Sequence, residues 1–217
     1  IEFYSHSNKF YYKKDKAYFE IFGEKCETAI GPAAGPATQQ AMNLAVSYLT
    51  GGRFFELKTV QILDSLEIEK PCIDVPDEGY NTEWSTEFSV PEAFDEYVKG
   101  WFLVHILEKM LGMSQLGERG FIFNMSVGYD LKGILTEKVQ WFFDQMNHAG
   151  SWIDKKKKEI KSIYPDIEVV NIPSQISNNV TLSTMHGCPP DEVEQISRYL
   201  IQKRKYHTTV KLNPTLL

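Results

Sequence analysis

The sequence predicts an α/β fold that forms the first five units of an eight-stranded β/α (TIM) barrel, preceded by an amino-terminal β-hairpin. Short apolar runs alternate with amphipathic helical segments, which is the pattern of parallel strands joined by crossover helices. Polar or charged residues end four of the five expected strands, as a ring of loops around one site requires. No G-x-G-x-x-G phosphate loop follows the first strand, so a doubly wound nucleotide-binding sheet is the weaker alternative. The expected strands cover residues 30–36, 53–61, 121–128, 180–185 and 208–213.

Composition is that of an ordinary globular protein. With 217 residues, 42% of them hydrophobic, the chain can bury one substantial core. Its net charge of -6 gives no general attraction to nucleic acid or to an anionic membrane, and the basic run at 155–158 is flanked by acids. Three scattered cysteines, Cys26, Cys72 and Cys188, argue for a reducing compartment and against a metal cluster in this chain. No signal peptide or membrane-length apolar run is visible, so a cytoplasmic protein is expected.

The amino-terminal segment, residues 1–27, is expected to form a hairpin that closes the bottom of the barrel. Two aromatic-rich runs, 9–14 and 17–23, flank the polar pair Asp15-Lys16, which is typical of a hairpin turn. Residues 28–217 are then expected to hold the barrel strands.

The first barrel unit is the clearest part of the pattern. Residues 30–36 read Ile-Gly-Pro-Ala-Ala-Gly-Pro, which favours a strand that ends in a tight loop. Thr38 stands at an N-cap position before an amphipathic helix over 39–49, which a Gly-Gly pair stops. The strand at 53–61 follows, so the unit predicts parallel strands joined by a right-handed crossover.

The remaining units follow the same plan with insertions. The long segment 62–90 is rich in aromatic residues, which indicates a functional loop rather than disorder. His105 falls among apolar helix positions, and one isolated histidine is expected to be packed rather than to act as a ligand. A barrel needs eight strands, so we expect this chain to be part of a longer protein. Helices are expected over 91–111, 132–149, 152–163 and from 191 onward.

Two lysines, Lys58 and Lys211, stand at the carboxyl ends of expected strands. Such a lysine can form a Schiff base with a carbonyl substrate, or it can hold an anionic group such as a reduced flavin or a phosphate. The structural alternative is an ion pair, for instance with Glu56 or Glu83. The residues alone leave these alternatives open.

Six short motifs stand in order along the chain. They are GPAAGP from Gly31, FELKTVQ from Phe55, NTEWSTEF from Asn81, FNMSVGYDL from Phe123, TLSTMHGCPP from Thr181 and VKLNPTLL from Val210. Together they resemble the FMN barrels of the dihydroorotate and dihydropyrimidine dehydrogenases and, more narrowly, bacterial oxidoreductases described as selenate reductase iron–sulfur subunits. The resemblance implies an FMN-dependent oxidoreductase barrel that acts on a planar nitrogen heterocycle, pyrimidine-like or purine-like. It also implies a larger protein in which absent domains carry iron–sulfur clusters and FAD and take electrons from NAD(P)H.

The resemblance also implies a role for individual positions. Ala33 and Ala34 would let the backbone approach the flavin, and the two strand-end lysines would lie at its pyrimidine edge. Further cofactor and substrate contacts would come from the long loop and from the later strands. The implied cofactor-binding residues are Ala33, Ala34, Lys58, Asn124, Thr181 and Lys211, and the implied substrate-binding residues are Asn81, Glu83 and Ser183.

Two departures from the family pattern bear on catalysis. Thr184 stands where the pyrimidine dehydrogenases present a cysteine as general acid, and a threonine hydroxyl is much less acidic than a thiol. Cys188 lies four residues on and is the alternative proton donor, and Thr181 stands where the family has a flavin-side asparagine. One alternative is therefore a structural or electron-transfer scaffold with a degenerate flavin site. Another is a Schiff-base lyase that uses Lys58 or Lys211.

Overall fold

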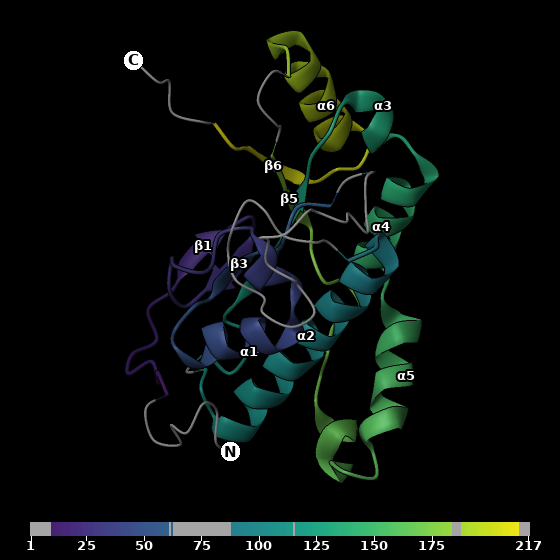
Figure 1. Ribbon diagram of the computed structural model, residues 1–217. Coiled ribbons are helices and arrows are strands. Elements are labelled where there is room, and N and C mark those ends of the chain that lie inside the picture. Colours follow the sequence, from purple (N-terminus) through teal and green to yellow (C-terminus); the bar gives the residue numbers. More distant parts are fainter. Residues whose placement is uncertain (1–9, 61, 63–87, 115, 184–187, 213–217) are drawn as a thin grey trace, which may run out of the picture.

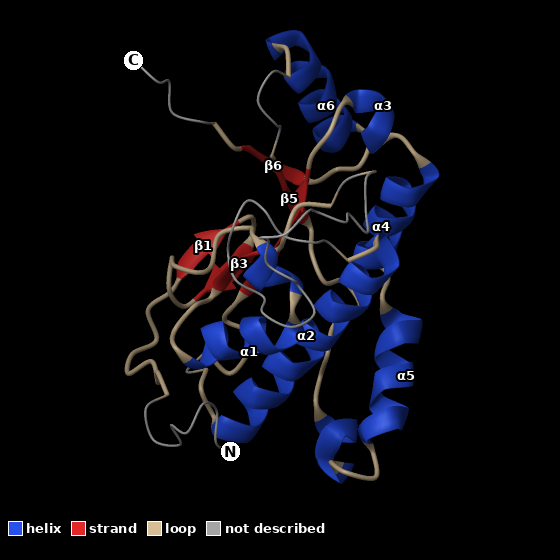
Figure 2. Ribbon diagram, viewed as in Figure 1, coloured by secondary structure: helices blue, strands red, loops and turns tan. Residues whose placement is uncertain are grey.

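The computed structural model describes residues 10–60, 62, 88–114, 116–183 and 188–212. Four parallel strands form one sheet in the order β3-β4-β5-β6, and the helices are layered beside it (Figures 1 and 2). The predicted α/β architecture with crossover helices between parallel strands is confirmed. The strands are β3 (Phe54–Glu56), β4 (Ile122–Val127), β5 (Asn179–Leu182) and β6 (His207–Val210). The helices are η1 (Pro36–Gln39), α1 (Ala41–Leu49), α2 (Val90–Leu111), α3 (Leu131–Ile134), α4 (Glu137–Asn147), α5 (Gly150–Ile160), η2 (Pro165–Val169) and α6 (Pro190–Gln202).

The two faces of the sheet differ in polarity. Residues in register across parallel strands point to the same face, and side chains alternate along each strand. One face carries Phe55, Phe123 and Leu182, which are at most 1% exposed and belong to the core. Trp101 of α2 packs on this face, with its ring centroid 5.2 Å from that of Phe123. The opposite face is polar, and it carries Glu56, Asn124, Ser126, Asn179, Thr181 and Thr209.

The sheet is curled so that its two outer strands approach each other. In a flat sheet β3 and β6 would lie roughly 14 Å apart, three times the usual spacing between strands. Near the carboxyl ends, the Lys211 Nζ lies 3.6 Å from Glu56 Oε1. Near the amino ends, the Phe22 ring contacts both the Phe54 ring, at 6.3 Å between centroids, and the His207 ring, at 5.3 Å. The polar face is therefore the concave face.

The first expected strand, residues 30–36, does not form a regular strand. Ile30 O accepts from Arg53 N and Phe54 N, at 2.9 and 3.1 Å, and Pro32 O accepts from Glu56 N at 3.2 Å. The segment therefore runs beside β3 in the parallel sense. A regular ladder cannot form because Pro32 has no N–H, and Gly31 lies so close that an added Cβ would come within 1.5 Å of Phe54 O.

Gly31→Ala is expected to lower the free energy of unfolding by about 1–3 kcal/mol, because the new methyl group must push β3 and the 30–32 segment apart. Chemical denaturation of the protein measures this. Gly150→Ala is the matched control, since its added Cβ would meet only the Ser174 Cβ at an ordinary 3.6 Å. Equal stability of the Gly31→Ala variant and the parent would contradict the close approach.

The amino-terminal hairpin is present, but its turn lies one segment later than the sequence pattern predicts. Strand β1 (Phe19–Ile21) pairs antiparallel with β2 (Glu24–Cys26). The turn is Phe22-Gly23, where both φ angles are positive, at 57° and 75°, as a type I′ hairpin requires. The prediction of a hairpin turn at Asp15-Lys16 was wrong, because the described residues 10–18 form no strand; the Asp15 carboxylate accepts from Lys13 Nζ and from Ala17 N in a local bend instead.

Helix ends follow local capping chemistry. At the start of α2, Ser89 N donates to Glu92 Oε2 at 3.0 Å in a capping box, and Gly112 ends the helix in the left-handed conformation. The predicted helix over 132–149 is instead two helices, because Asp130 caps α3 and Thr136 restarts the chain as α4. Thr38 does not cap α1 as predicted, since its hydroxyl donates to Gly35 O within η1. Within the described part of the chain, no helix has the length and apolarity needed to cross a membrane.

Candidate functional site

The carboxyl ends of the parallel strands bring together residues that are far apart in the sequence. Glu56 ends β3 and Lys211 follows β6, yet their side chains form an ion pair at 3.6 Å. Ala34 N, in the loop before η1, donates to the other Glu56 carboxylate oxygen at 3.0 Å. Three separate segments of the chain therefore meet at the Glu56 carboxylate. The side chain of Lys211 keeps 41% of its surface exposed there. This group of residues is called the strand-end site below.

Lys58 lies two residues after Glu56, so in extended backbone its side chain points to the same face of the sheet as that of Glu56. Leu57 between them is fully buried, and Leu57 N donates to Asn124 O at 3.0 Å, which continues the strand alternation. The Lys58 carbonyl accepts from the Tyr97 hydroxyl of α2 at 2.9 Å, which fixes the backbone here. The prediction that both lysines follow parallel strands of one sheet is therefore met by the structure. Ala33 is exposed next to Ala34 at the same edge.

Beneath the strand-end site, a buried hydrogen-bonded chain joins β4 and β5. The Asn124 amide donates to Asn179 Oδ1 at 2.6 Å, and its oxygen accepts from the Thr181 hydroxyl at 2.7 Å. These three side chains are at most 6% exposed. Both ends of the Asn124 amide already have a protein partner, so Asn124 and Thr181 form the polar floor of the site. Asn179 was missed in the sequence, although the polar alternation at 179, 181 and 183 signals it.

Thr181→Val is expected to lower the free energy of unfolding by about 1–3 kcal/mol, because it leaves the buried Asn124 oxygen without this donor. The matched control is Thr209→Val. Thr209 is in register with Thr181 on the neighbouring strand but is exposed, so its loss should cost less than about 0.5 kcal/mol. Thermal or urea unfolding of both variants measures the difference. Equal effects would show that the buried bond contributes little.

A second pair of hydroxyl groups lies at the same edge. The Thr59 and Ser126 hydroxyl oxygens are 2.8 Å apart, and Ser126 is 1% exposed. Ser183 follows β5, and its N donates to Val127 O at 2.8 Å. An added Cβ on Gly128 would come within 2.5 Å of Ser183 O, so only glycine lets these two loops pass so closely.

No contact among the described residues brings Cys188, one of the two predicted proton donors, to this edge. Thr184, Asn81 and Glu83 lie outside the described residues, so their predicted roles stay predictions. Cys188 is described, and its charged neighbours are Glu192 and Asp130, at the beginnings of α6 and α3. Burial raises the pKa of the Cys188 thiol, and these two carboxylates raise it further, so the thiol stays protonated at neutral pH.

Sequence reasoning named Glu56 only as a structural ion-pair partner for one of the strand-end lysines. The structure bears this alternative out for Lys211 and adds a hydrogen bond from Ala34 N to the second carboxylate oxygen. The available signal was its position, two residues before Lys58 and therefore on the polar face. Its partner depends on the curl of the sheet, which sequence periodicity does not reveal.

Comparisons with known proteins agree with this architecture. A family model described as "Oxidoreductase YgfK, N-terminal TIM-barrel domain" matches residues 3–217. Two curated relatives, from Escherichia coli strain K12 and from Escherichia coli O157:H7, are both named "Putative oxidoreductase YgfK". Each is 48% identical over 221 residues, which cover 91% of this chain and 21% of the relative. No solved structure matched significantly.

The chain thus spans about one fifth of the length of these relatives. The match confirms the predicted barrel class, and its wording agrees with an oxidoreductase. Because the model covers nearly the whole sequence, the chain belongs to the family of YgfK oxidoreductases and corresponds to their N-terminal TIM-barrel domain.

Proposed function

We propose that this domain is an FMN-dependent oxidoreductase barrel that acts on a planar nitrogen heterocycle at the strand-end site. The observation that carries the proposal is the convergence of the Lys211 ammonium and Ala34 N on one carboxylate, at 3.6 and 3.0 Å. Membership in an oxidoreductase family supports the reaction class. In barrels of this type, chemistry is located at the carboxyl ends of the strands.

The residues present fit a flavin in two respects. The Lys211 ammonium and the Ala34 N–H are donors of the kind that the pyrimidine edge of a reduced flavin needs, and both would exchange their contact with Glu56 for the cofactor. The loop that supplies Ala34 has small side chains, so the backbone can approach a planar ring. When bound, FMN would supply hydride transfer to or from the heterocycle.

The chain's own residues would then bind and orient the flavin and the heterocycle. Ala33 and Ala34 would present backbone groups, and Lys58 and Lys211 would stabilise negative charge. The buried Asn124–Thr181 pair would hold the floor of the site rigid, because both side chains are already hydrogen-bonded within the protein. The candidates for the proton donor stay Thr184 and the Cys188 thiol, which would have to reach the strand-end site from the start of α6. NAD(P)H, FAD and iron–sulfur clusters belong, in this proposal, to other parts of a larger protein.

Reconstitution with FMN tests the reaction class in a full-length protein that contains this domain. We expect bound flavin that is reduced by NAD(P)H under anaerobic conditions and reoxidised by a planar pyrimidine or purine analogue. Flavin that binds but never exchanges hydride with any such heterocycle would favour the scaffold alternative instead. Borohydride trapping of a carbonyl substrate on Lys58 or Lys211 would favour the lyase. Absence of any flavin would contradict the proposal.

A further inference from the structure

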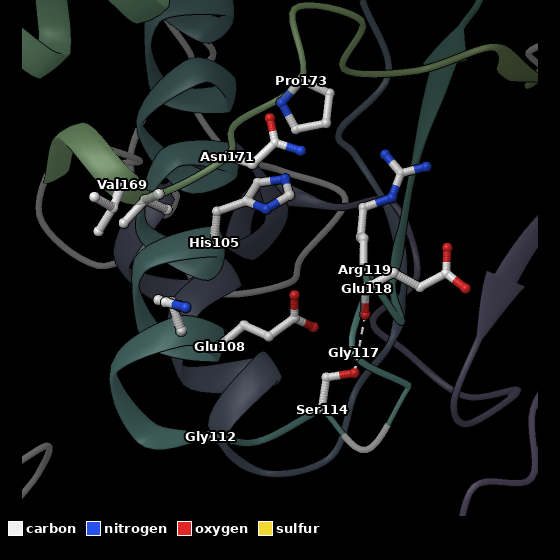
Figure 3. Close-up of a pocket in the computed structure, with 12 residues that line it drawn as sticks. His105, Glu108, Gly112, Ser114, Gly117, Glu118, Arg119, Val169, Asn171 and Pro173 are labelled. Carbon is white, nitrogen blue, oxygen red and sulfur yellow. Dashed lines mark hydrogen bonds between the residues drawn. The ribbon is translucent and has the colours of Figure 1, made fainter.

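A second pocket lies at the opposite end of the domain from the strand-end site. It has a volume of about 470 Å³, within the usual range for small-molecule sites. The carboxyl-terminal half of α2 forms one wall, and the loops that lead into β4 and β5 form the others (Figure 3). These loops enter the amino ends of the strands, so the pocket is separate from the site proposed above. It is called the α2 pocket below.

The inner wall of the α2 pocket presents a buried nitrogen that has no partner among the described residues. His105 is 5% exposed, and among the residues that the structure describes its Nε2 has no hydrogen-bond partner. Figure 3 shows the imidazole between the Asn171 amide and the Glu108 carboxylate. The Trp101 and Phe121 rings pack edge-on against it, at 4.6 and 5.0 Å, and fix its position. Burial lowers the pKa of His105 to about 3, so the ring is neutral, and in its Nδ1-protonated tautomer Nε2 offers a lone pair.

The same wall carries a carboxylate that forms no ion pair with any described residue. Glu108 Oε1 accepts two hydrogen bonds, one from the Tyr48 hydroxyl at 3.1 Å and one from Gly120 N at 3.5 Å. Over the described residues, Oε2 has neither a hydrogen bond nor an ion pair. An unpaired carboxylate in a partly buried place is costly unless a cation or a proton neutralises it.

The other charges around the pocket are already neutralised or exposed. Arg53, behind Glu108, is paired with Glu27 at 3.1 Å. Arg119 is paired with Glu24, and its guanidinium lies 5.0 Å from the Trp101 ring centre. The Glu118 carboxylate is paired with Lys25, and Lys109 is exposed at the rim. The groups that face Glu108 are thus Tyr48, Arg53, Glu27, His105, Lys109, Ser114, Glu118, Arg119 and Gly120 N.

We propose that the α2 pocket binds a small organic cation, an amine, amidinium or guanidinium, whose N–H groups are accepted by Glu108 Oε2 and His105 Nε2. The two acceptors come from one helix turn, three residues apart, so they lie on the same face. The binding does not depend on the flavin proposal, since it uses none of the strand-end residues.

Binding should depend on pH, because a proton and the cation compete for the same carboxylate. Desolvation raises the pKa of Glu108 to about 7. Guanidinium compounds stay protonated well above this range, so only the protein titrates. Below pH 7 the carboxylate is increasingly protonated and the cation must displace a proton. Apparent affinity is therefore expected to fall about tenfold between pH 8 and pH 6.

Isothermal titration or amide chemical shifts of the whole chain test the proposal, with methylguanidinium as the probe and N-methylurea as its neutral analogue of similar shape. Methylguanidinium is expected to bind with a dissociation constant in roughly the millimolar range, as suits so small a ligand. It should bind at least about tenfold more tightly than N-methylurea at pH 8, where Glu108 is ionised.

Glu108→Gln should remove both the affinity and its pH dependence while keeping the shape of the wall. Glu118→Gln is the matched control, because Glu118 lines the same pocket but is exposed and paired with Lys25. The Glu118→Gln variant should bind methylguanidinium with nearly the affinity of the parent. No binding by the parent, equal binding of N-methylurea, a preference for acetate, or unchanged affinity in Glu108→Gln would each overturn the proposal. A thermal unfolding curve of Glu108→Gln shows that the variant is folded.

Discussion

Arg53→Met is expected to lower the free energy of unfolding by about 3–5 kcal/mol. The Arg53 and Glu27 side chains are both 0% exposed and form an ion pair at 3.1 Å. The same guanidinium donates to Tyr48 O and Gly52 O, at 2.7 and 2.9 Å, and lies 4.0 Å from the Tyr48 ring centre. Methionine fills much of the space but leaves the Glu27 charge buried without this partner, which is the costly outcome.

Urea denaturation measures this loss. The matched control is Arg198→Met, which breaks the Arg198–Glu194 pair on α6, where both side chains are more than 60% exposed. That change should cost less than about 1 kcal/mol. Adding Glu27→Leu to Arg53→Met should recover part of the stability, because the orphaned charge is removed. A loss below about 1 kcal/mol for Arg53→Met would contradict the assignment of a buried pair.

Lys211→Ala, in a full-length protein that contains this domain, is expected to slow flavin reduction or reoxidation by about 10²–10³-fold. On the proposed function, the variant lacks one preorganised positive group at the strand-end site, where negative charge would develop during hydride transfer. Anaerobic stopped-flow absorbance measures the rate. Lys211→Arg should recover part of it, because the charge is kept while the geometry changes.

Lys203→Ala is the control for Lys211→Ala. Lys203 is also an exposed lysine near the carboxyl end of the described chain, but it follows α6 and lies outside the strand-end site. Its loss should leave the rate within about twofold of the parent, as for most surface substitutions. A Lys211→Ala protein that reacts as fast as the Lys203→Ala protein would show that the strand-end amine has no part in the chemistry.

Much of the fold was predictable because it depends on local patterns. Short apolar runs identified β4 and β5. Ser89, Pro91 and Gly112 mark the ends of α2 through capping chemistry that acts within a few residues. The segment 30–36 was predicted to be a strand because it is short and apolar, as buried strands are. Its backbone nevertheless bonds to β3 only through carbonyls, and a proline and a close glycine prevent a regular ladder.

The sequence pointed to residues that lie at the strand ends, but it did not show which of them contact one another. The rule that parallel strands present chemistry at their carboxyl ends pointed to Lys58, Asn124 and Lys211. The Glu56–Lys211 pair depends on the curl of the sheet, and the Asn124–Thr181–Asn179 chain depends on strand register. Both are set by long-range packing. The α2 pocket escaped notice because His105 has the ordinary signature of a packed histidine, and the missing partner of its Nε2 is visible only in three dimensions.

The most direct test of the central claim, that the strand-end site holds a flavin, is the FMN content of a full-length protein that contains this domain. Flavin absorbance after gel filtration should show stoichiometric FMN in the parent and in a Lys132→Ala/Lys203→Ala control. The Lys58→Ala/Lys211→Ala protein should lose most of its flavin, because both positive groups at the site are removed. A parent without flavin, or a Lys58→Ala/Lys211→Ala protein that keeps as much FMN as the parent, would contradict the account.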